Sequence, residues 1–282
     1  MSSSNVTAQP LPTRTRLKHA IQQRLPLSLL STYRLFRNGD HRQLMRFLFD
    51  RNVRLSFADR RTFARRLMRV SRHVPCEHFQ SEILAVARAV FATNPAVPGV
   101  VVEAGCYKGG STAKLSIAAK MAARKLYAFD SFQGIPDNAE DHGRNLFGGT
   151  AAFYKGDYCG TLDEVRANVA RWGEISACEF VPGFFDDSMP GFNRPVVAAF
   201  LDVDLASSTR TCLKHLYPQL VPGGTFFSQD GHLPLVVKEI ESDALWAEIG
   251  YLRPVLHGAG RQKLVWLQKP ADQTCRGQGY GA

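Results

Sequence analysis

The feature that most constrains the fold is the alternation, from residue 79 onward, of apolar strand-like runs with segments of helical periodicity. Runs such as VVVEA and VVAAFL are apolar almost throughout, so both of their faces must be buried. This property is typical of a parallel sheet that helices cover on two sides. The sequence therefore predicts a doubly wound, mainly parallel α/β domain over residues 74–270. Its ligand should bind beyond the carboxyl ends of the strands.

The alternation also predicts the individual elements of this domain. Helices are expected for FQSEILAVARAVFAT, TAKLSIAAKMAA, LDEVRANVARWG, STRTCLKHLYPQL and VKEIESDALWAEIG. Strands are expected for GVVVEAG, KLYAFDS, ACEFVPG, VVAAFLDVD, GGTFFSQD and KLVWLQK. No apolar run reaches the length of about 18 residues that a transmembrane helix needs, so none is expected.

Positive charge is concentrated before this domain. Residues 1–73 hold 16 Lys and Arg against three acids, whereas the remaining residues hold 19 against 22. Because the strand-and-helix domain is not basic, the overall charge of +10 does not predict nucleic-acid binding. We expect a disordered tail over residues 1–13, a basic helical cap over 14–73 and a second tail over 271–282.

The basic cap has two interpretations. Its helices either cover the main domain or present arginines to a lipid headgroup, an acidic carrier or a second copy of the chain, which would give a homo-oligomer. In its last helix, apolar residues recur at Phe63, Leu67 and Val70, and Asp59 is the expected N-cap. The six cysteines form no CxxC pair, which favours reduced thiols and a cytoplasmic location.

The stretch VVVEAGCYKGGST, residues 100–112, is the first candidate binding motif. The spacing Glu103-x-Gly105-x3-Gly109 is neither the dinucleotide fingerprint nor a Walker A loop, which argues against an NAD oxidoreductase and against phosphate binding. An acid at this turn suits an ammonium group, and the following helix N-terminus suits a carboxylate. Together they match the methionine end of S-adenosylmethionine.

Asp130 is a second anchor. It ends the next predicted strand, 25 residues beyond Gly105. A carboxylate there can accept hydrogen bonds from both ribose hydroxyls of an adenosine. The alternative is a turn-forming or helix-capping role.

A group of acids follows two later strands. Asp202 and Asp204 end the run FLDVDL, and Asp230 follows the next strand, 28 residues beyond Asp202. Carboxylates from adjacent strand ends can share one hard cation such as Mg²⁺, which would lower the pKa of a bound hydroxyl. Asp204 alternatively caps the helix that begins near Ser207.

Five ordered motifs, E-A-G-x-x-x-G-G-S, F-D-S-F-x-G-I-P, V-P-G-F-F-x-D-S-M-P, L-D-V-D-L-x-S-S-T and L-Y-P-x-L-x-P-G-G, resemble those of the macrocin O-methyltransferase family. The resemblance runs from about Val74 to Leu267. It implies a class I S-adenosylmethionine-dependent enzyme with a seven-stranded Rossmann-like methyltransferase sheet. Family members methylate hydroxyls, often of sugars on natural products, so the implied partner is a small-molecule hydroxyl acceptor.

The resemblance also implies positions for the cofactor. Its methionine end would lie against Glu103, Gly105, Tyr107, Gly109 and Ser111. The ribose would lie at Asp130, beside Ser131 and Phe132. The adenine would lie against the turn Gly183-Phe184-Phe185, with Asp187 and Ser188, and Asp202 would border both cofactor and metal.

Several positions depart from the related patterns. The macrocin family typically has two adjacent acids where this chain has Gln229-Asp230, and catechol-type enzymes have Asp-Asn where it has Asp230-Gly231. The catechol-type lysine base is replaced by Leu205. The metal ligands expected are therefore Asp202 and Asp230. His232 is expected either as a further ligand or as the general base, Asp204 is the other catalytic candidate, and His142 is a weaker candidate for the base. The alternative is a non-catalytic or differently reacting S-adenosylmethionine-binding protein with a degenerate metal site.

Overall fold

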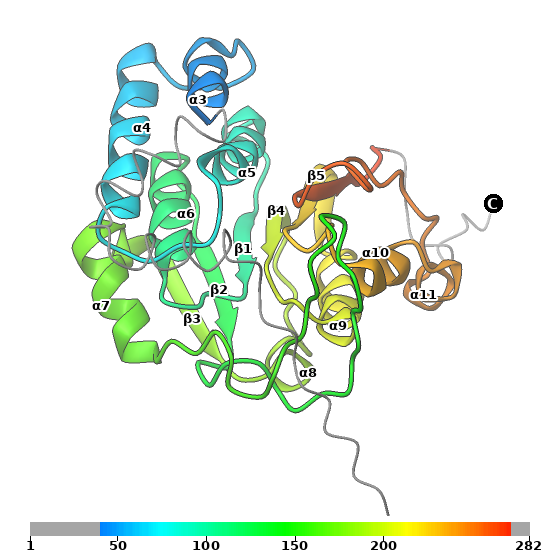
Figure 1. Ribbon diagram of the computed structural model, residues 1–282. Helices are drawn as coiled ribbons and strands as arrows, with labels where there is room; N and C mark the ends of the chain where they lie inside the picture. The colour runs from blue at the N-terminus through cyan, green and yellow to red at the C-terminus, as the bar shows by residue number, and fades with distance from the viewer. Residues whose placement is uncertain (1–39, 272–282) are drawn as a thin grey trace, which may run out of the picture.

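The computed structural model describes residues 40–271. The tail expected at residues 1–13, the first part of the basic cap and all but the first residue of the C-terminal tail lie outside this range. A six-stranded sheet in the order β3-β2-β1-β4-β5-β6 forms the centre of the described part (Figure 1). β1 to β5 are parallel and β6 is antiparallel to β5, which confirms the doubly wound, mainly parallel architecture. The strands are β1 (Val100–Ala104), β2 (Leu126–Asp130), β3 (Cys178–Pro182), β4 (Val196–Leu201), β5 (Leu220–Ser228) and β6 (Val265–Gln268).

The strand count differs from the seven that the family resemblance implies. Between the last helix and β6, the described chain adds only an isolated bridge that pairs His257 with Trp266. Pro254 lacks a backbone N–H, and Gly258 and Gly260 have positive φ angles. An extended seventh strand therefore does not form in this segment.

Helices cover both faces of the sheet. One layer holds α3 (Asp40–Phe49), α4 (Phe57–Ser71), α5 (Gln80–Ala92), α6 (Gly110–Met121) and α7 (Leu162–Trp172). The other holds α9 (Ala206–Leu216), α10 (Pro234–Ile240) and α11 (Asp243–Ile249). The short elements η1 (Ile175–Ala177) and α8 (Phe185–Ser188) flank β3.

Successive strand residues face opposite layers. Val101 and Phe200 belong to the core cluster under the first layer, whereas Val102 and Leu201 belong to the cluster under the second. All four side chains are almost fully buried. The burial of both faces is the reason why these strands are apolar almost throughout.

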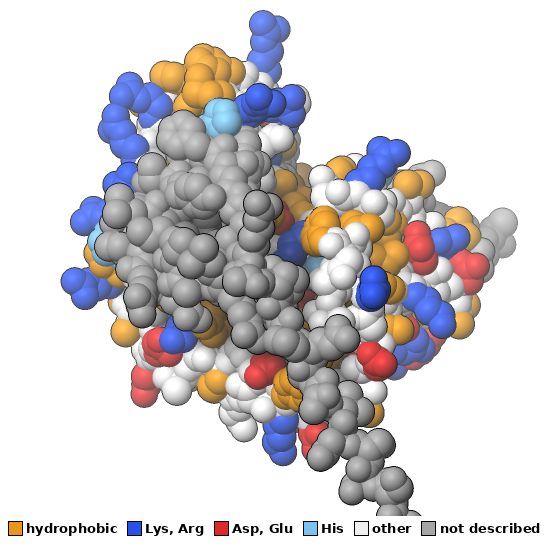
Figure 2. Space-filling model, viewed as in Figure 1, with side chains coloured by type: hydrophobic (Ala, Val, Ile, Leu, Met, Phe, Trp, Pro, Cys, Tyr) orange, Lys and Arg blue, Asp and Glu red, His pale blue; other side chains and the backbone are white. Residues whose placement is uncertain are grey.

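The described part of the basic cap packs on the same core as α5. Phe63, Leu67 and Val70 are fully buried in it, and the ring of Phe63 meets Phe91 of α5 edge to face, with centroids 5.3 Å apart. Asp40 joins α3 to α5, because its carboxylate accepts hydrogen bonds from the backbone of Gln80 at 2.9 Å and of the next residue at 3.2 Å. Figure 2 shows Lys and Arg side chains on the outer surface of this region.

Some helix boundaries differ from the expectation. The N-cap of α4 is Ser56, whose hydroxyl accepts from the backbone N–H of Asp59 at 3.1 Å and donates to its carboxylate at 2.6 Å. Asp59 is thus the acidic partner of the cap and not the cap itself. The segment expected as one helix over residues 237–250 is divided into α10 and α11, because Ser242 caps a new helix by accepting from Leu245. None of the helices in residues 40–271 combines the length and the apolar character needed to span a membrane.

Gly105 occupies a position where the sheet has no room for a side chain. Its φ is +88°, and a Cβ atom there would lie 2.0 Å from the carbonyl oxygen of Asp202. We expect Gly105→Ala to lower the free energy of unfolding by about 3 kcal/mol or more, because backbone strain adds to the clash between main chains. Gly191→Ala is the matched control, since Gly191 has a φ of +83° and nothing within 4 Å. The substitution Gly191→Ala should lower the free energy of unfolding by only about 1–2 kcal/mol. Urea unfolding measures both, and equal losses would contradict the prediction.

Candidate functional site

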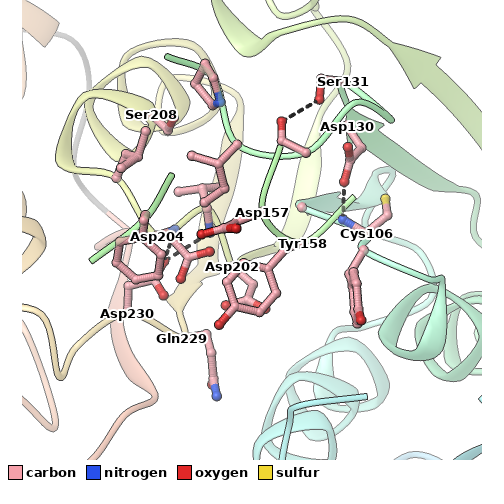
Figure 3. A pocket seen from close by; sticks show the side chains of 18 of the residues that line it. Cys106, Asp130, Ser131, Asp157, Tyr158, Asp202, Asp204, Ser208, Gln229 and Asp230 are labelled. Carbon is pink, nitrogen blue, oxygen red and sulfur yellow. Dashed lines mark hydrogen bonds between the residues drawn. The ribbon is translucent and has the colours of Figure 1, made fainter. Parts of the chain in front are cut away.

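A cavity of about 720 Å³ opens beyond the carboxyl ends of β1, β2 and β4 (Figure 3). Its floor is the turn between β1 and α6, and the long connection from β2 to α7 forms a wall. Figure 3 shows Asp202, Asp204 and Asp230 gathered on one side and Asp130 on the other. Of the predicted site residues, the cavity is lined by Gly105, Tyr107, Ser111, Asp130, Ser131, Phe184, Phe185, Asp187, Asp202, Asp204, Asp230 and His232. The residues outside this lining are Glu103, Gly109, Phe132, His142, Gly183 and Ser188.

The glycine turn brings the backbone to the cavity. Gly105 follows β1 directly, and its N–H donates to the carbonyl of Phe129 at 3.0 Å. Gly109 has a φ of +79° and is the N-cap of α6, so it shapes the turn from behind. The open N-terminus of α6 leaves Gly110 and Ser111 on the cavity surface. This arrangement can accept a negatively charged group of a ligand.

Asp130 holds the floor of the cavity together. Its Oδ2 accepts from the N–H of Cys106 and its Oδ1 from the N–H of Phe132, both at 2.6 Å. Burial raises the pKa of this carboxyl although these bonds oppose the shift. Each oxygen keeps a second lone pair, so Asp130 can also accept hydrogen bonds from ligand hydroxyls.

Glu103 lies behind the glycine turn on β1 and is fully buried. Burial raises its pKa to about 7, while the nearby hydroxyls of Ser111 and Thr112 oppose the shift. Its Oε1 has no hydrogen-bond partner within residues 40–271. A ligand in the cavity therefore meets the turn before it meets this carboxyl.

The acid cluster, defined here as Asp202, Asp204 and Asp230, brings three carboxylate oxygens within 4.8 Å of one another. Asp230 Oδ2 accepts from the backbone N–H groups of Val203 and Asp204, both at 3.0 Å, and its Oδ1 is buried without a partner among the described residues. Burial and the charge of Asp202 raise the pKa of Asp230 to about 7. Burial and the two other carboxylates raise the pKa of Asp204 well above its usual range.

Asp204 does not cap the helix that follows it. The N-terminus of α9 is capped by Glu140, whose carboxylate accepts from the N–H of Ala206 at 2.7 Å and from the N–H of Ser207 at 2.9 Å. Asp204 instead has a φ of +60° and lines the cavity. The strained backbone keeps its carboxylate in the acid cluster.

The acid cluster fits a hard divalent cation. All three donors are carboxylates, as Mg²⁺ prefers, and Asp230 Oδ1 is a buried acceptor that a cation would satisfy. A cation would also relieve the repulsion that raises the pKa values of Asp204 and Asp230. Lys263, which lines the same side of the cavity, partly offsets this charge.

The two histidines proposed as bases differ in position. His232 lines the cavity, and its ring stacks on Phe147 with centroids 6.0 Å apart. Burial and the charge of Lys263 lower its pKa to about 4, so the ring is neutral at neutral pH. His142 belongs to the β2–α7 connection and is buried there, where its ring meets Phe153 edge to face. Burial lowers its pKa as well.

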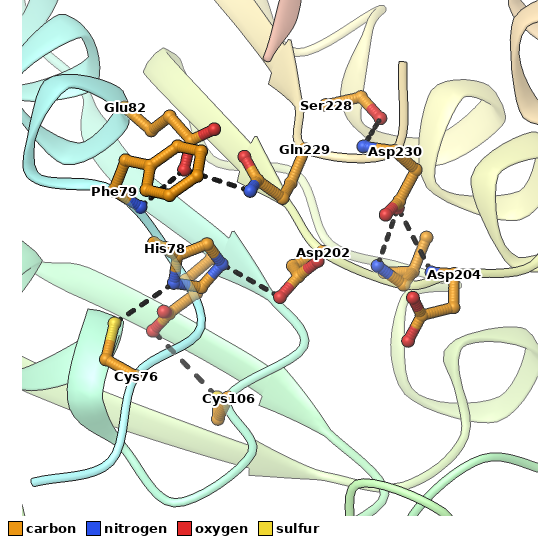
Figure 4. A network of polar contacts seen from close by, with 12 residues as sticks. Cys76, His78, Phe79, Glu82, Cys106, Asp202, Asp204, Ser228, Gln229 and Asp230 are labelled. Carbon is orange, nitrogen blue, oxygen red and sulfur yellow. Dashed lines mark hydrogen bonds and ion pairs between the residues drawn. The ribbon is translucent and has the colours of Figure 1, made fainter. Parts of the chain in front are cut away.

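His78 is a site residue that the sequence did not indicate. Its Nε2 lies 2.8 Å from Asp202 Oδ2 and its Nδ1 lies 3.3 Å from the sulfur of Cys76 (Figure 4). Burial raises the pKa of the Asp202 carboxyl, but His78 outweighs this effect and the net shift is downward. His78 and Cys76 both precede α5 and lie far in sequence from every strand end. No sequence pattern therefore indicates that they lie near Asp202.

Gln229, which stands where the family typically has an acid, points away from the acid cluster. Its amide donates to Glu82 Oε2 of α5 at 3.0 Å (Figure 4). Glu82 also accepts from the backbone N–H of Phe79 at 2.6 Å, and burial raises its pKa. A second acid at position 229 would face this buried carboxyl, so the amide is the residue type that fits here.

The pairing of Gln229 with Glu82 is testable by an exchange of side chains. We expect Gln229→Glu to lower the free energy of unfolding by about 2–3 kcal/mol, because it replaces a buried hydrogen bond with two facing carboxyls. The double variant Glu82→Gln with Gln229→Glu should recover part of the loss, since the new amide can donate to the new carboxylate. Urea unfolding in EDTA measures each variant. If the double variant lost as much free energy of unfolding as Glu82→Gln and Gln229→Glu lose together, the pairing would be contradicted.

Comparison with known proteins places the site in a family. The family model described as Macrocin-O-methyltransferase (TylF) matches residues 25–241. The chain is 34% identical over 142 residues to the 8-demethyl-8-(2,3-dimethoxy-alpha-L-rhamnosyl)-tetracenomycin-C 4'-O-methyltransferase of Streptomyces olivaceus, a match that covers 48% of this chain and 53% of the relative. It is 33% identical over 154 residues to the mycinamicin III 3''-O-methyltransferase of Micromonospora griseorubida, covering 51% and 59%. The chain thus spans a little over half the length of these curated relatives.

Solved structures agree on the fold. The O-methyltransferase NovP superposes with a TM-score of 0.54 and 24% identity, covering 68% of this chain and 81% of that one. CalS11, a calicheamicin methyltransferase, superposes with a TM-score of 0.52 and 16% identity, covering 74% and 92%. Because the family model covers most of the chain and its motifs line the cavity described above, this protein belongs to the macrocin-O-methyltransferase (TylF) family.

Proposed function

We propose that the protein is an S-adenosylmethionine-dependent O-methyltransferase that acts on a sugar hydroxyl of a small natural product. The observation that carries this proposal is the single cavity in which the glycine turn, Asp130 and the acid cluster meet. The turn and Asp130 suit the two ends of the cofactor. The acid cluster stands where a hydroxyl must be positioned and deprotonated.

Each part of the cavity has a role in cofactor binding. The N-terminus of α6, at Gly110 and Ser111, receives the methionine carboxylate. Asp130 accepts from the ribose hydroxyls, and Phe185 supplies an apolar wall for the adenine. The turn and Asp202 would hold the methionine ammonium group.

The reaction forms a bond between the acceptor oxygen and the methyl carbon while the bond from that carbon to sulfur breaks, and it releases one proton. The residues of this chain hold the hydroxyl in line with the methyl group and accept the proton. Asp204 and the neutral Nδ1 of His232 are the two candidate acceptors. A magnesium ion held by Asp202, Asp204 and Asp230 would supply the Lewis acidity that lowers the pKa of the hydroxyl.

The acceptor is proposed from the relatives and from the cavity wall. One curated relative is named as the 4'-O-methyltransferase of a rhamnosyl-tetracenomycin, and another as the 3''-O-methyltransferase of mycinamicin III. In this chain, Phe153 and Tyr158 line the cavity on the β2–α7 connection. Aromatic rings of this kind pack against the apolar face of a sugar.

The alternative is a protein that binds S-adenosylmethionine without transferring its methyl group. The amide of Gln229 in place of a family acid favours this alternative, because it removes one possible metal ligand. The three remaining carboxylates weigh against it. A cytoplasmic location and a homo-oligomer formed through the basic helices stay predictions.

Cofactor binding is the first test of the proposal. The purified protein should bind S-adenosylhomocysteine in isothermal titration calorimetry and should not bind NAD. Asp130→Asn should weaken binding by about 1.5–3 kcal/mol, the range for a charge-assisted hydrogen bond. Asp163→Asn, an acid-to-amide change on α7 outside the cavity, is the control and should bind normally. Absence of S-adenosylhomocysteine binding would overturn the proposal.

The acid cluster has its own test. Manganese binding, measured by electron paramagnetic resonance, should weaken at least about 10-fold in Asp230→Asn. The control Asp137→Asn changes an acid that lines the same cavity outside the cluster and should bind manganese normally. With mycinamicin III as trial acceptor, EDTA should abolish methyl transfer and Mg²⁺ should restore it. Full activity in EDTA, kept in Asp230→Asn and lost in His232→Ala, would replace the metal with a histidine base.

A further inference from the structure

Cys76 lies at the cavity in a cluster of charged groups that the methyl-transfer reaction does not use. It lines the cavity from the segment between α4 and α5. Its sulfur is 3.3 Å from Nδ1 of His78 (Figure 4). The same sulfur is 3.4 Å from Nζ of Lys114 on α6. We define these three residues as the thiol cluster.

Lys114 gives the thiol cluster its charge. The side chain is fully buried, and it forms no ion pair with a carboxylate among residues 40–271. A buried ammonium group is costly unless an anion compensates it. The sulfur of Cys76 is the group placed to supply that anion, as a thiolate.

Other groups around the Cys76 sulfur carry charges of both signs. His78 on the same segment, itself held against Asp202, adds positive charge. Glu103 from β1 is a nearby acid, and the charge of Cys76 contributes to the raised pKa of Glu103. Burial raises the pKa of the Cys76 thiol, but Lys114 and His78 outweigh this effect and lower it to about 6.

The other cysteines of the described part lack this surrounding. Burial raises the pKa of Cys106 and Cys212 well above the usual range and that of Cys178 to about 12. Cys159 is exposed, and its sulfur donates to the carbonyl of Phe132 at 3.8 Å. A thiolate that is stabilised by cations and open to a cavity is the environment of a reactive cysteine.

We propose that Cys76 is a covalent modification site for low-molecular-weight disulfides and similar soft electrophiles that enter the cavity. The Cys76 thiolate attacks one sulfur of the disulfide, forming a new S–S bond while the original S–S bond breaks. The second half of the disulfide leaves as a thiolate and takes a proton from water. The product is a mixed disulfide on Cys76, and a reducing thiol reverses it by the same exchange.

The adduct has a consequence for the cavity that rests on the proposed function. A glutathionyl group on Cys76 would project beside Asp202 and Gly105, where the cofactor is proposed to bind. It would also remove the anion opposite Lys114 and His78. Modification should therefore block cofactor binding until the disulfide is reduced.

The pH profile of alkylation tests the site without reference to methyl transfer. The full chain carrying Cys159→Ser is treated with iodoacetamide, and the rate at Cys76 is followed by peptide mass spectrometry. Between pH 6 and pH 9 the rate of alkylation at Cys76 should rise only about twofold, whereas that of an ordinary cysteine thiol of pKa about 8.5 rises more than about 100-fold. Because the rates at pH 9 and pH 6 are compared for the same cysteine, their ratio does not depend on how easily the reagent reaches it.

Two variants connect the profile to the thiol cluster. Lys114→Met removes the ammonium group and should restore a steep pH dependence at Cys76, while Cys76→Ser should abolish labelling there. Circular dichroism establishes that each variant is folded, and if Lys114→Met does not fold, the profile of the Cys159→Ser protein decides alone. A steep, ordinary profile at Cys76, or no labelling at any pH, would overturn the proposal.

The physiological form of the reaction uses oxidised glutathione as the probe. One glutathionyl group should appear on Cys76 at pH 7 and disappear with dithiothreitol; its absence would contradict the proposed chemistry. S-adenosylhomocysteine should protect Cys76 from the reaction. If Cys76 reacts but S-adenosylhomocysteine gives no protection, the modification site stands and the proposed cofactor position is wrong.

Discussion

Three carboxylates held within 4.8 Å of one another are the constraint on which the ligand edge of the sheet depends. Negative charge concentrated at this density, and mostly out of water, is unfavourable unless the surroundings compensate it. Asp202 is compensated by His78, and Asp230 by two backbone N–H groups. Lys263 acts on the whole cluster at longer range. Asp204 keeps the least compensation and the most strained backbone, which makes it the member most free to interact with a ligand.

The groups that compensate the negative charge of Asp202 continue away from the acid cluster as a series of side chains with alternating charge. Asp202 faces His78, His78 faces Cys76, and Cys76 faces the buried Lys114 of α6. A buried polar network of this kind stabilises the fold only when every member has its partner. Two of its four members come from the segment between α4 and α5. The connection from the described N-terminal helices is therefore part of the candidate site and not only a cover over the core.

The sequence predicted the features that follow from strand ends, because parallel strands deliver their carboxyl ends to one edge. The order of strands and helices, the glycine turn, Asp130 and the three carboxylates all arise in this way. Residues that reach the site from elsewhere were missed, since nothing in the local pattern of His78 indicates a distant partner. The cap of α9 was missed for the same reason, because Glu140 comes from a loop 66 residues earlier. The prediction of a seventh strand was wrong, because Pro254 has no backbone N–H to donate and only an isolated bridge forms in this segment.

Gln229 shows how a departure from a family pattern can be compensated elsewhere in the structure. In the sequence alone, the amide at position 229 suggests that one metal ligand is lost and that the metal site is degenerate. In the structure this side chain faces α5, where Glu82 supplies a buried carboxyl at 3.0 Å. The acid cluster is complete without it, because Asp204 takes the third position through a left-handed backbone. Three carboxylates thus remain close enough to share one cation, although the acid at position 229 is replaced. The number and spacing of carboxylates, and not their place in a motif, decide whether this edge of the sheet can hold a cation.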